Sequence, residues 1–246
     1  MAILWQKQVG DTRYEVRTAG RSRRLYSNGV FHSQYHPERP HSGGVWDLLM
    51  LPAFFRAPTR IKRILVLGVG GGTVIHLLRR FLQPQEIIGV ELNRVHLQVA
   101  RQFFAIKKDM ATLHQADAVQ WLNDYDGPAF DMIIDDLFGN EDTDLGRAVP
   151  ADTAWCSTLL RNLNRNGVLV MNFIGGKALR HSACVSEPLI ARHFTSSFQL
   201  SLPVYENAIG AFLGHPASSQ GLRKNLARVP ELSGRHIDFR IRKINP

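Results

Sequence analysis

Cysteine is scarce in this sequence, and long apolar runs are missing. Only Cys156 and Cys184 occur among the 246 residues, which argues against a disulfide framework and indicates two buried apolar thiols in a reducing compartment. No apolar stretch approaches the ~18 residues that cross a bilayer. The first residues, MAILWQKQVGDTRYEV, lack the apolar segment and cleavage site of a signal peptide. We therefore expect a cytoplasmic protein that has no membrane partner.

Nucleic-acid-binding motifs, internal repeats and low-complexity tracts are also missing. The net charge is nevertheless +9 and the isoelectric point is about 10.0. Such a surplus suits an anionic partner, but the basic residues gather near both ends of the chain, around positions 13–24 and 235–243, without a recognisable motif. A solvated basic surface is the preferred interpretation, and nucleic acid stays an open alternative.

Hydrophobic residues make up 44% of the chain, which is enough for a packed core. The hydrophobic pattern and the composition divide the chain into three regions. Residues 1–57 are expected to form strands, hairpins and a helix (44–55), and residues 58–214 alternating strands and helices. Residues 215–246 form a basic polar tail. The alternation predicts an α/β, Rossmann-like domain whose mostly parallel, seven-stranded sheet carries helices on both faces. The predicted strands are 64–67, 86–91, 111–115, 130–135, 168–173, 198–202 and 209–213. The predicted helices are 73–81, 94–104, 118–124, 152–163, 181–193 and 220–227.

A glycine-rich loop, VLGVGGGTV, follows the first of these strands. It contains Gly68, Gly70, Gly71 and Gly72, and a helix begins directly after it. A strand, such a loop and a helix in this order direct backbone N–H groups toward a nucleotide. The dinucleotide fingerprint would need glycine at position 73, and Thr73 stands there. The loop therefore predicts a nucleoside ligand and disfavours NAD(P).

Two further strand ends carry carboxylates. Glu91 lies about 20 residues after the loop, where an acid can accept hydrogen bonds from ribose hydroxyls. Asp117 can accept from an adenine amine while Ala118 N–H meets a ring nitrogen, or it can cap the following helix. With Leu92, these residues and the four glycines form the predicted binding set for an S-adenosylmethionine (AdoMet) type of nucleoside.

Here the sequence resembles the spermidine synthase family over residues 14–214. The resemblance rests on the following segments: RRLYSNGVFHSQYHPERPHSGGVWDLLMLPAFF, RILVLGVGGGTVIHLLRRF, IIGVELNRVHLQVARQFF, LHQADAVQWL and FDMIIDDLFG. It implies polyamine biosynthesis, in which the aminopropyl group of decarboxylated AdoMet moves to a diamine. By resemblance, Glu91 would hold the ribose, Asp117 and Ala118 the adenine, and Asp135 the attacking amine.

The motifs on the substrate side depart from that family. Gly71 replaces the loop aspartate that contacts the aminopropyl amine. The family's Asp-Ser-Ser-Asp-Pro corresponds to residues 135–139, which read DDLFG. Its Tyr-His/Gln-Glu is matched only by Val45-Trp46-Asp47. The sequence is therefore similar to the divergent, spermidine synthase-like branch, and an AdoMet-dependent methyltransferase and a non-catalytic basic binding module both stay open as alternatives.

We expect a transferase in which Asp135, at the end of the fourth strand, holds and deprotonates an amine acceptor. An acidic loop follows with Glu141, Asp142 and Asp144. The cosubstrate would be AdoMet or decarboxylated AdoMet, with no metal, because prolines break the segment that holds the histidines at 32, 36 and 41. The oligomeric state is open, with a homodimer as one alternative. The predicted substrate-binding residues are Gln34, Trp46, Asp47 and Asp136.

Overall fold

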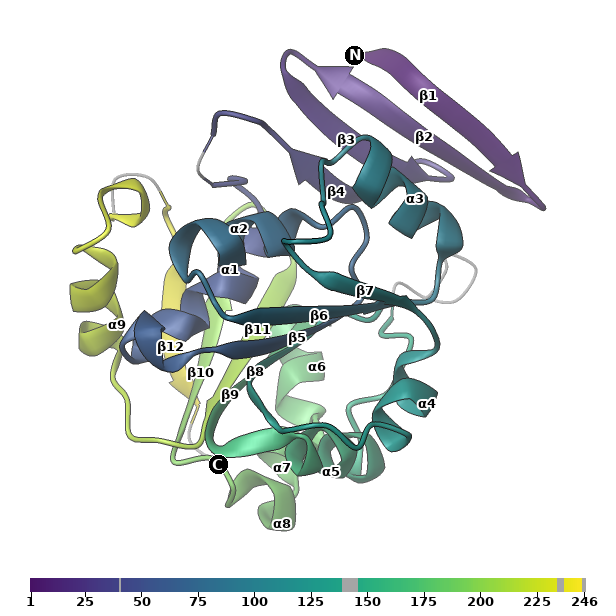
Figure 1. Cartoon of the computed structure of the whole chain (residues 1–246). Helices are drawn as coiled ribbons and strands as arrows, with labels where there is room; N and C mark the ends of the chain where they lie inside the picture. The colour runs from purple at the N-terminus through teal and green to yellow at the C-terminus, as the bar shows by residue number, and fades with distance from the viewer. Residues whose placement is uncertain (40, 139–145, 234–236, 245–246) are drawn as a thin grey trace.

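The computed structural model describes residues 1–39, 41–138, 146–233 and 237–244, which form two β-sheets and surrounding helices (Figure 1). A four-stranded antiparallel sheet comes first in the chain, and an eight-stranded sheet follows. The strands are β1 Ala2–Val9, β2 Thr12–Ala19, β3 Ser22–Ser27, β4 Val30–Tyr35, β5 Arg63–Leu67, β6 Glu86–Glu91, β7 Thr112–Gln115, β8 Phe130–Asp135, β9 Leu163–Ile174, β10 Ser196–Ser201, β11 Asn207–Leu213 and β12 Arg240–Ile244.

The large sheet has the order β12-β10-β11-β9-β8-β5-β6-β7. Its strands from β9 to β7 are parallel, because they are joined by helical crossovers, while β11, β10 and β12 pair antiparallel. The predicted α/β, mostly parallel architecture is confirmed. One strand more than the predicted seven is present, since β12 from the basic tail pairs along β10. Its five residues include three basic ones and carry no strand signal of their own.

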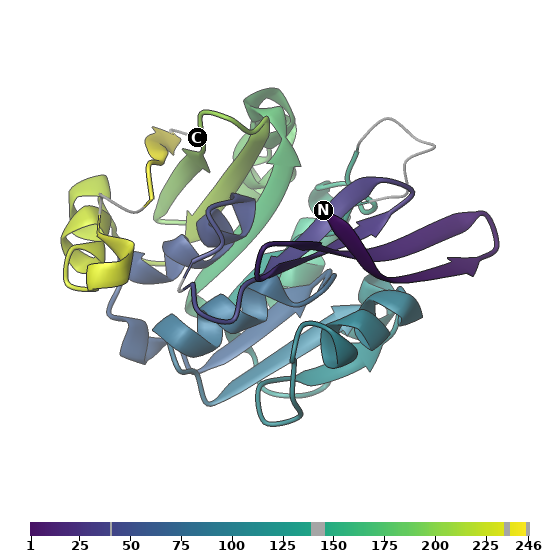
Figure 2. The same cartoon turned by 90° about the horizontal axis from the view of Figure 1, so that it is seen from above.

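Helices cover both faces of this sheet, as Figures 1 and 2 show. The helices are α1 Val45–Met50, α2 Thr73–Phe81, α3 Arg94–Gln102, α4 Ala118–Asn123, α5 Thr153–Arg161, α6 Gly175–His181, α7 Ala183–Ser186, α8 Pro188–Ala191 and α9 Ser219–Leu226, with 3₁₀ turns at Leu51–Phe55, Pro58–Arg60 and Pro230–Leu232. Helices α1, α2 and α9 supply one apolar core and α4 to α7 the other. None of the helices in the described part of the chain is long and apolar enough to cross a membrane.

Two predicted helices differ from the observed ones. The helix at 44–55 changes to 3₁₀ geometry at Leu51, because Pro52 lies in the first turn of that segment and has no N–H to donate. The single helix at 181–193 is wrong. Ser182 has extended backbone angles, and Pro188 starts a new turn, so the segment forms the short helices α6, α7 and α8 instead.

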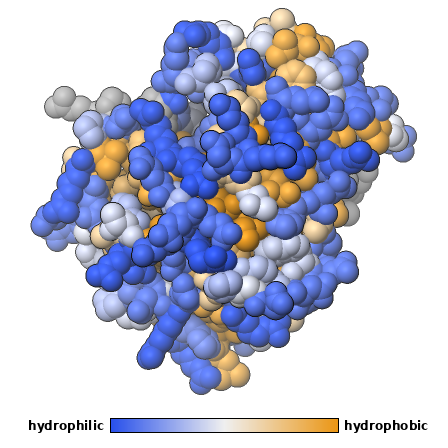
Figure 3. Space-filling view, in the orientation of Figure 1, coloured by the Kyte–Doolittle hydropathy of each residue, from blue (hydrophilic) through white to orange (hydrophobic). Residues whose placement is uncertain are grey.

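The N-terminal sheet packs on α3 and reaches the carboxyl edge of the large sheet (Figure 1). Tyr14, Val16 and Leu25 form a small apolar cluster with residues of α3 and with Phe104. Strand β1, which the sequence analysis did not predict, lies at the outer edge of this sheet and is mostly exposed. Figure 3 shows apolar atoms at the end of the molecule where Figure 1 places β1. This sheet positions β4 beside the glycine-rich loop.

Candidate functional site

The glycine-rich loop is in close contact with two neighbouring segments. Gly68 has a φ of +81°, and a Cβ there would lie 2.4 Å from the carbonyl oxygen of Asp136 at the end of β8. A Cβ at Gly71 would lie 2.8 Å from both Ser33 Cβ and Phe104 Cε1. Real Cβ atoms do not approach backbone or packed side chains so closely. An aspartate at position 71 therefore does not fit this loop without movement of its neighbours.

Ser33 of β4 holds the loop from the N-terminal side. The Gly71 N–H donates to Ser33 Oγ at 2.7 Å, and Ser33 is buried. Thr73 adds a second link, because its hydroxyl donates to the Gln34 carbonyl and accepts from the Gln34 N–H. No sequence pattern pointed to this serine, since a small polar residue inside a strand has no characteristic spacing.

Glu91 ends β6 beneath the loop and is 8% exposed. Its Oε2 accepts from the N–H groups of Val69 at 3.0 Å and Gly70 at 2.8 Å, and its Oε1 accepts from Asn93 N–H at 2.8 Å. Burial raises the pKa of Glu91, but the nearby His96 imidazole and these N–H donors outweigh it, so the pKa lies below its ordinary value. A carboxylate has about four lone-pair positions, so Oε1 can still accept one ribose hydroxyl.

Two histidines flank this carboxylate. His96 Nδ1 lies 3.9 Å from Glu91 Oε1, and its Nε2 is 3.0 Å from Ser27 Oγ. The His32 ring lies 4.9 Å from the His96 ring. Burial, together with the charge of His96, lowers the pKa of His32 to about 4, against the opposing effect of Glu91. His32 is therefore neutral at pH 7 and adds no positive charge to the site.

The predicted adenine side lies at the ends of β6 and β7. Asp117 is exposed, and its Oδ1 caps α4 by accepting from Gln120 N–H at 2.9 Å. Its second oxygen has no partner within the described residues, so capping leaves it available to an amine. Ala118 is buried in the first turn of α4, whereas Leu92 is 68% exposed. This arrangement is compatible with an adenine between Leu92 and Asp117, which stays a prediction.

We expect Glu91→Ala to weaken nucleoside binding by at least about tenfold. The substitution leaves the loop N–H groups and a ribose hydroxyl without an acceptor, and each unsatisfied buried group costs about 1–3 kcal/mol. Calorimetric titration with S-adenosylhomocysteine measures the loss. Asp124→Ala, an exposed change on the far end of α4, is the control and should leave the affinity unchanged. Equal affinities for wild type and Glu91→Ala would contradict this role.

Asp135, the predicted amine-holding residue, is fully buried at the end of β8. Its Oδ2 accepts from Arg147 Nη2 at 2.5 Å and from Trp155 Nε1 at 2.8 Å, and Oδ1 accepts from Leu137 N–H at 3.3 Å. The side chain of Arg147 is only 8% exposed. It also donates to the carbonyls of Asn172 and Val149. The geometry therefore places Asp135 in an internal ion pair and disfavours a contact with substrate.

Asp136 is the neighbouring carboxylate and is less engaged. Asn172 Nδ2 donates to its Oδ1 at 2.8 Å, and Asn207 in turn donates to Asn172. Its Oδ2 has no hydrogen-bond partner in the described part of the chain. Burial raises the pKa of Asp136 to about 7, and the charge of Asp135 adds to this effect, while the hydrogen bond from Asn172 opposes it. The backbone carbonyl of Asp136 lies against Gly68, and a carboxylate with this pKa can exchange a proton near neutral pH.

Three of the predicted substrate-binding residues have structural partners instead. The Gln34 amide accepts from Arg24 and donates to the Ser42 carbonyl. The Trp46 ring packs edge-on against Phe31. Asp47 is buried and accepts from the N–H groups of Ser42 and Gly43. Two members of that set adjoin the glycine-rich loop through their backbones, Gln34 at Thr73 and Asp136 at Gly68.

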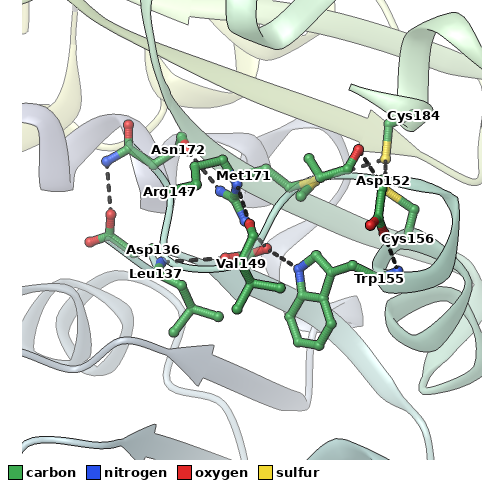
Figure 4. Close-up of polar contacts among 12 residues, drawn as sticks. Asp136, Leu137, Arg147, Val149, Asp152, Trp155, Cys156, Met171, Asn172 and Cys184 are labelled. Atoms are coloured by element: carbon green, nitrogen blue, oxygen red, sulfur yellow. Dashed lines mark hydrogen bonds and ion pairs between the residues drawn. The ribbon is translucent and has the colours of Figure 1, made fainter. Parts of the chain in front are cut away.

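Other predicted features lie outside the site or outside the described residues. Glu141, Asp142 and Asp144 of the acidic loop, together with Gly139, belong to the segment that the structure does not describe. Cys156 and Cys184 are buried free thiols whose sulfur atoms lie 3.3 Å apart, and Figure 4 shows them beside the group of contacts that includes Arg147 and Trp155. In residues 1–39, 41–138, 146–233 and 237–244, no group of three potential metal ligands is arranged around a common point.

The family model that matches this chain and two similar solved structures point to the same family of proteins. The profile of the spermine/spermidine synthase domain matches residues 47–203. A probable spermidine synthase from Corynebacterium glutamicum has a similar structure, with a TM-score of 0.76 and 16% sequence identity, and the match covers 99% of this chain and 92% of that one. Spermidine synthase from Thermotoga maritima matches with a TM-score of 0.67 and 14% identity, over 93% of this chain and 78% of that one.

Methyltransferases are also similar. The eEF1A lysine and N-terminal methyltransferase of Xenopus laevis is 26% identical over 142 residues, which are 54% of this chain and 20% of that protein. The match therefore spans about one fifth of this curated relative. Human methyltransferase-like protein 13, in complex with SAH, has a TM-score of 0.60 and 19% identity, over 73% of this chain and 87% of that one. At these identities the structural matches establish the fold alone.

Proposed function

We propose that this chain, which belongs to the spermine/spermidine synthase domain family by its match over residues 47–203, is an AdoMet-dependent transferase. We propose further that the group it transfers is a methyl group and that the acceptor is an amine. The nucleoside lies across the carboxyl edge of the large sheet, with Glu91 at the ribose and Asp117 at the adenine. Bound AdoMet supplies a methyl group that its sulfonium makes electrophilic.

The observation that best supports proton transfer from an amine is the raised pKa of Asp136. An attacking amine must lose a proton as its bond to carbon forms, and a carboxylate with a pKa of about 7 can receive that proton at neutral pH. Asn172 donates to one oxygen of Asp136, and the other oxygen, which has no partner among the described residues, would receive the proton. The protein otherwise positions two reactants, since the electrophile is already activated.

The balance of charges favours methyl transfer over aminopropyl transfer. Decarboxylated AdoMet keeps the ammonium of AdoMet but lacks the neighbouring carboxylate, so this ammonium needs a carboxylate partner from the protein. Position 71 is glycine, Asp135 is neutralised by Arg147, and Asp136 is half protonated near pH 7. No fixed, unpaired carboxylate therefore faces that ammonium among the described residues of the loop and of the β8 end. Sequence similarity to a methyltransferase over 54% of the chain supports the same proposal.

Aminopropyl transfer is the second candidate. It is favoured by the family itself and by similar structures such as a spermidine synthase in complex with the transition-state analogue AdoDATO. That structure matches with a TM-score of 0.70 and 13% identity, over 93% of this chain and 79% of that one. Both candidates share the same fold and the same nucleoside position. The two candidate reactions differ in the group that leaves the sulfonium, which is a methyl group in one and an aminopropyl group in the other.

Titration followed by product analysis distinguishes these candidates. AdoMet, decarboxylated AdoMet, methylthioadenosine and NAD are titrated separately, and we expect AdoMet to bind at least tenfold more tightly than its decarboxylated form. Mass spectrometry then follows incubation with putrescine or with a lysine-containing peptide, where a gain of one methyl is expected. A gain of one aminopropyl group would establish the second candidate. Failure of all four nucleosides to bind would leave a non-catalytic binding module.

A further inference from the structure

A second pocket lies at the opposite edge of the large sheet. It has a volume of about 720 Å³ and is formed by the amino end of β9, the segment after α8, and Gly214 after β11. Because β9 and β10 begin here while β11 ends here, this is the amino edge, away from the glycine-rich loop. Figure 1 places α8 at the end of the molecule opposite to the N-terminal sheet. We call this hollow the amino-edge pocket.

The rim of the amino-edge pocket carries three basic side chains without partners. Arg165, Arg192 and His193 line it and are exposed. None of them makes a side-chain hydrogen bond or an ion pair with any described residue. Asp131, also at this edge, is already engaged by the N–H groups of Lys62 and Arg63 and by the Asn164 amide. The rim therefore has an uncompensated positive charge.

A further basic side chain, Arg56, contacts a residue that lines the amino-edge pocket. Arg56 Nη1 donates to the Asn166 carbonyl at 2.7 Å, and Asn166 itself lines the pocket. Guanidinium groups bind phosphate oxygens through two parallel hydrogen bonds, and this geometry is stronger and more specific than a point charge. Two free guanidinium groups and an imidazole around one hollow are thus suited to an anion with several oxygens.

The floor of the same pocket is apolar. Leu160, Leu163 and Phe194 line it, and its volume lies in the range of small-molecule sites, roughly 300–1,000 Å³. An apolar floor below a basic rim fits a ligand that has both a phosphate and a less polar body. We propose that the amino-edge pocket binds a phosphate-bearing small molecule, with Arg165 and Arg192 holding the phosphate. This site is independent of the nucleoside site and of the proposed transfer reaction.

The test uses calorimetric titration of the full chain, with S-adenosylhomocysteine present so that the nucleoside site does not take up the probes. Inorganic phosphate, uridine monophosphate and uridine are titrated in turn. We expect uridine monophosphate to bind and uridine not to bind. If uridine monophosphate binds at least tenfold more tightly than phosphate, the ligand is a phosphate monoester that uses the apolar floor. Equal affinities would identify free phosphate as the ligand.

The variant Arg165→Gln/Arg192→Gln should weaken the binding of uridine monophosphate by at least 30-fold. Both side chains are exposed and lack partners, so thermal melting should be unchanged. The matched control, Arg101→Gln/Lys108→Gln, removes the same charge from the exposed surface of α3 and the loop after it, and should change the affinity less than twofold. An equal loss in both double variants would overturn the proposal, as would the absence of any phosphate-dependent binding at 10 mM probe.

Discussion

Asp136→Asn is expected to lower the turnover number by at least about 100-fold while the affinity for the nucleoside stays within twofold. General-base catalysis by a positioned side chain contributes about 10²–10⁴ in rate, and asparagine cannot receive the proton from the amine. The substitution is nearly isosteric. Its oxygen can still accept the hydrogen bond from Asn172, so the fold at the end of β8 is preserved. Steady-state rates and titration with S-adenosylhomocysteine measure both quantities.

The pH dependence provides the control. The pKa of Asp136 is raised to about 7, so the carboxylate is protonated and inactive as a base below that pH and becomes active above it. The rate of the wild type is therefore expected to fall tenfold per unit of pH below about 7, and the residual rate of Asp136→Asn should lack this inflection. If Asp136→Asn keeps the full rate and the same profile, the proton leaves by another group.

Much of the fold could be predicted from the sequence because its signals are local. Strands β6 and β8 and helix α2 have the predicted bounds. The two strands are apolar runs that end at a carboxylate, and the amphipathic helix begins directly after Gly72. The predictions fail where tertiary contacts decide. The tail strand β12 exists through pairing with β10, and β1 through pairing with β2. Neither strand is buried in the core: β1 is mostly exposed, and β12 is exposed or half-buried.

The candidate site also contains residues that could be predicted from the sequence and residues that could not. The glycine-rich loop, Glu91 and Asp117 follow successive strands, and parallel strands bring their carboxyl ends to one edge, so their proximity could be predicted. The roles of Asp135 and Asp136 could not be assigned. Adjacent residues point to opposite faces of a strand, and Arg147, which pairs with Asp135, comes from a segment beyond the acidic loop. No spacing rule connects that arginine to the strand end.

The ion pair between Asp135 and Arg147 leads to the prediction with the largest effect on stability. Arg147→Met leaves the fully buried Asp135 carboxylate with only the Trp155 and Leu137 N–H donors. Removing one partner of a buried pair costs about 3–5 kcal/mol. At about 2–4 °C per kcal/mol for a chain of this size, the melting temperature should fall by roughly 10 °C. Thermal unfolding followed by circular dichroism measures the change.

The double variant Asp135→Asn/Arg147→Met separates the two roles proposed for Asp135. Removing both charges leaves no uncompensated ion, so the double variant should recover most of the stability that Arg147→Met loses. If Asp135 serves this internal pair alone, the double variant also keeps nucleoside binding and a turnover number within about tenfold of the wild type. If instead Asp135 holds the amine, which was the expectation from the sequence, the double variant is inactive although it is folded. The stability and the rate of Arg147→Met and of the double variant, each compared with the wild type, therefore decide whether Asp135 faces the acceptor.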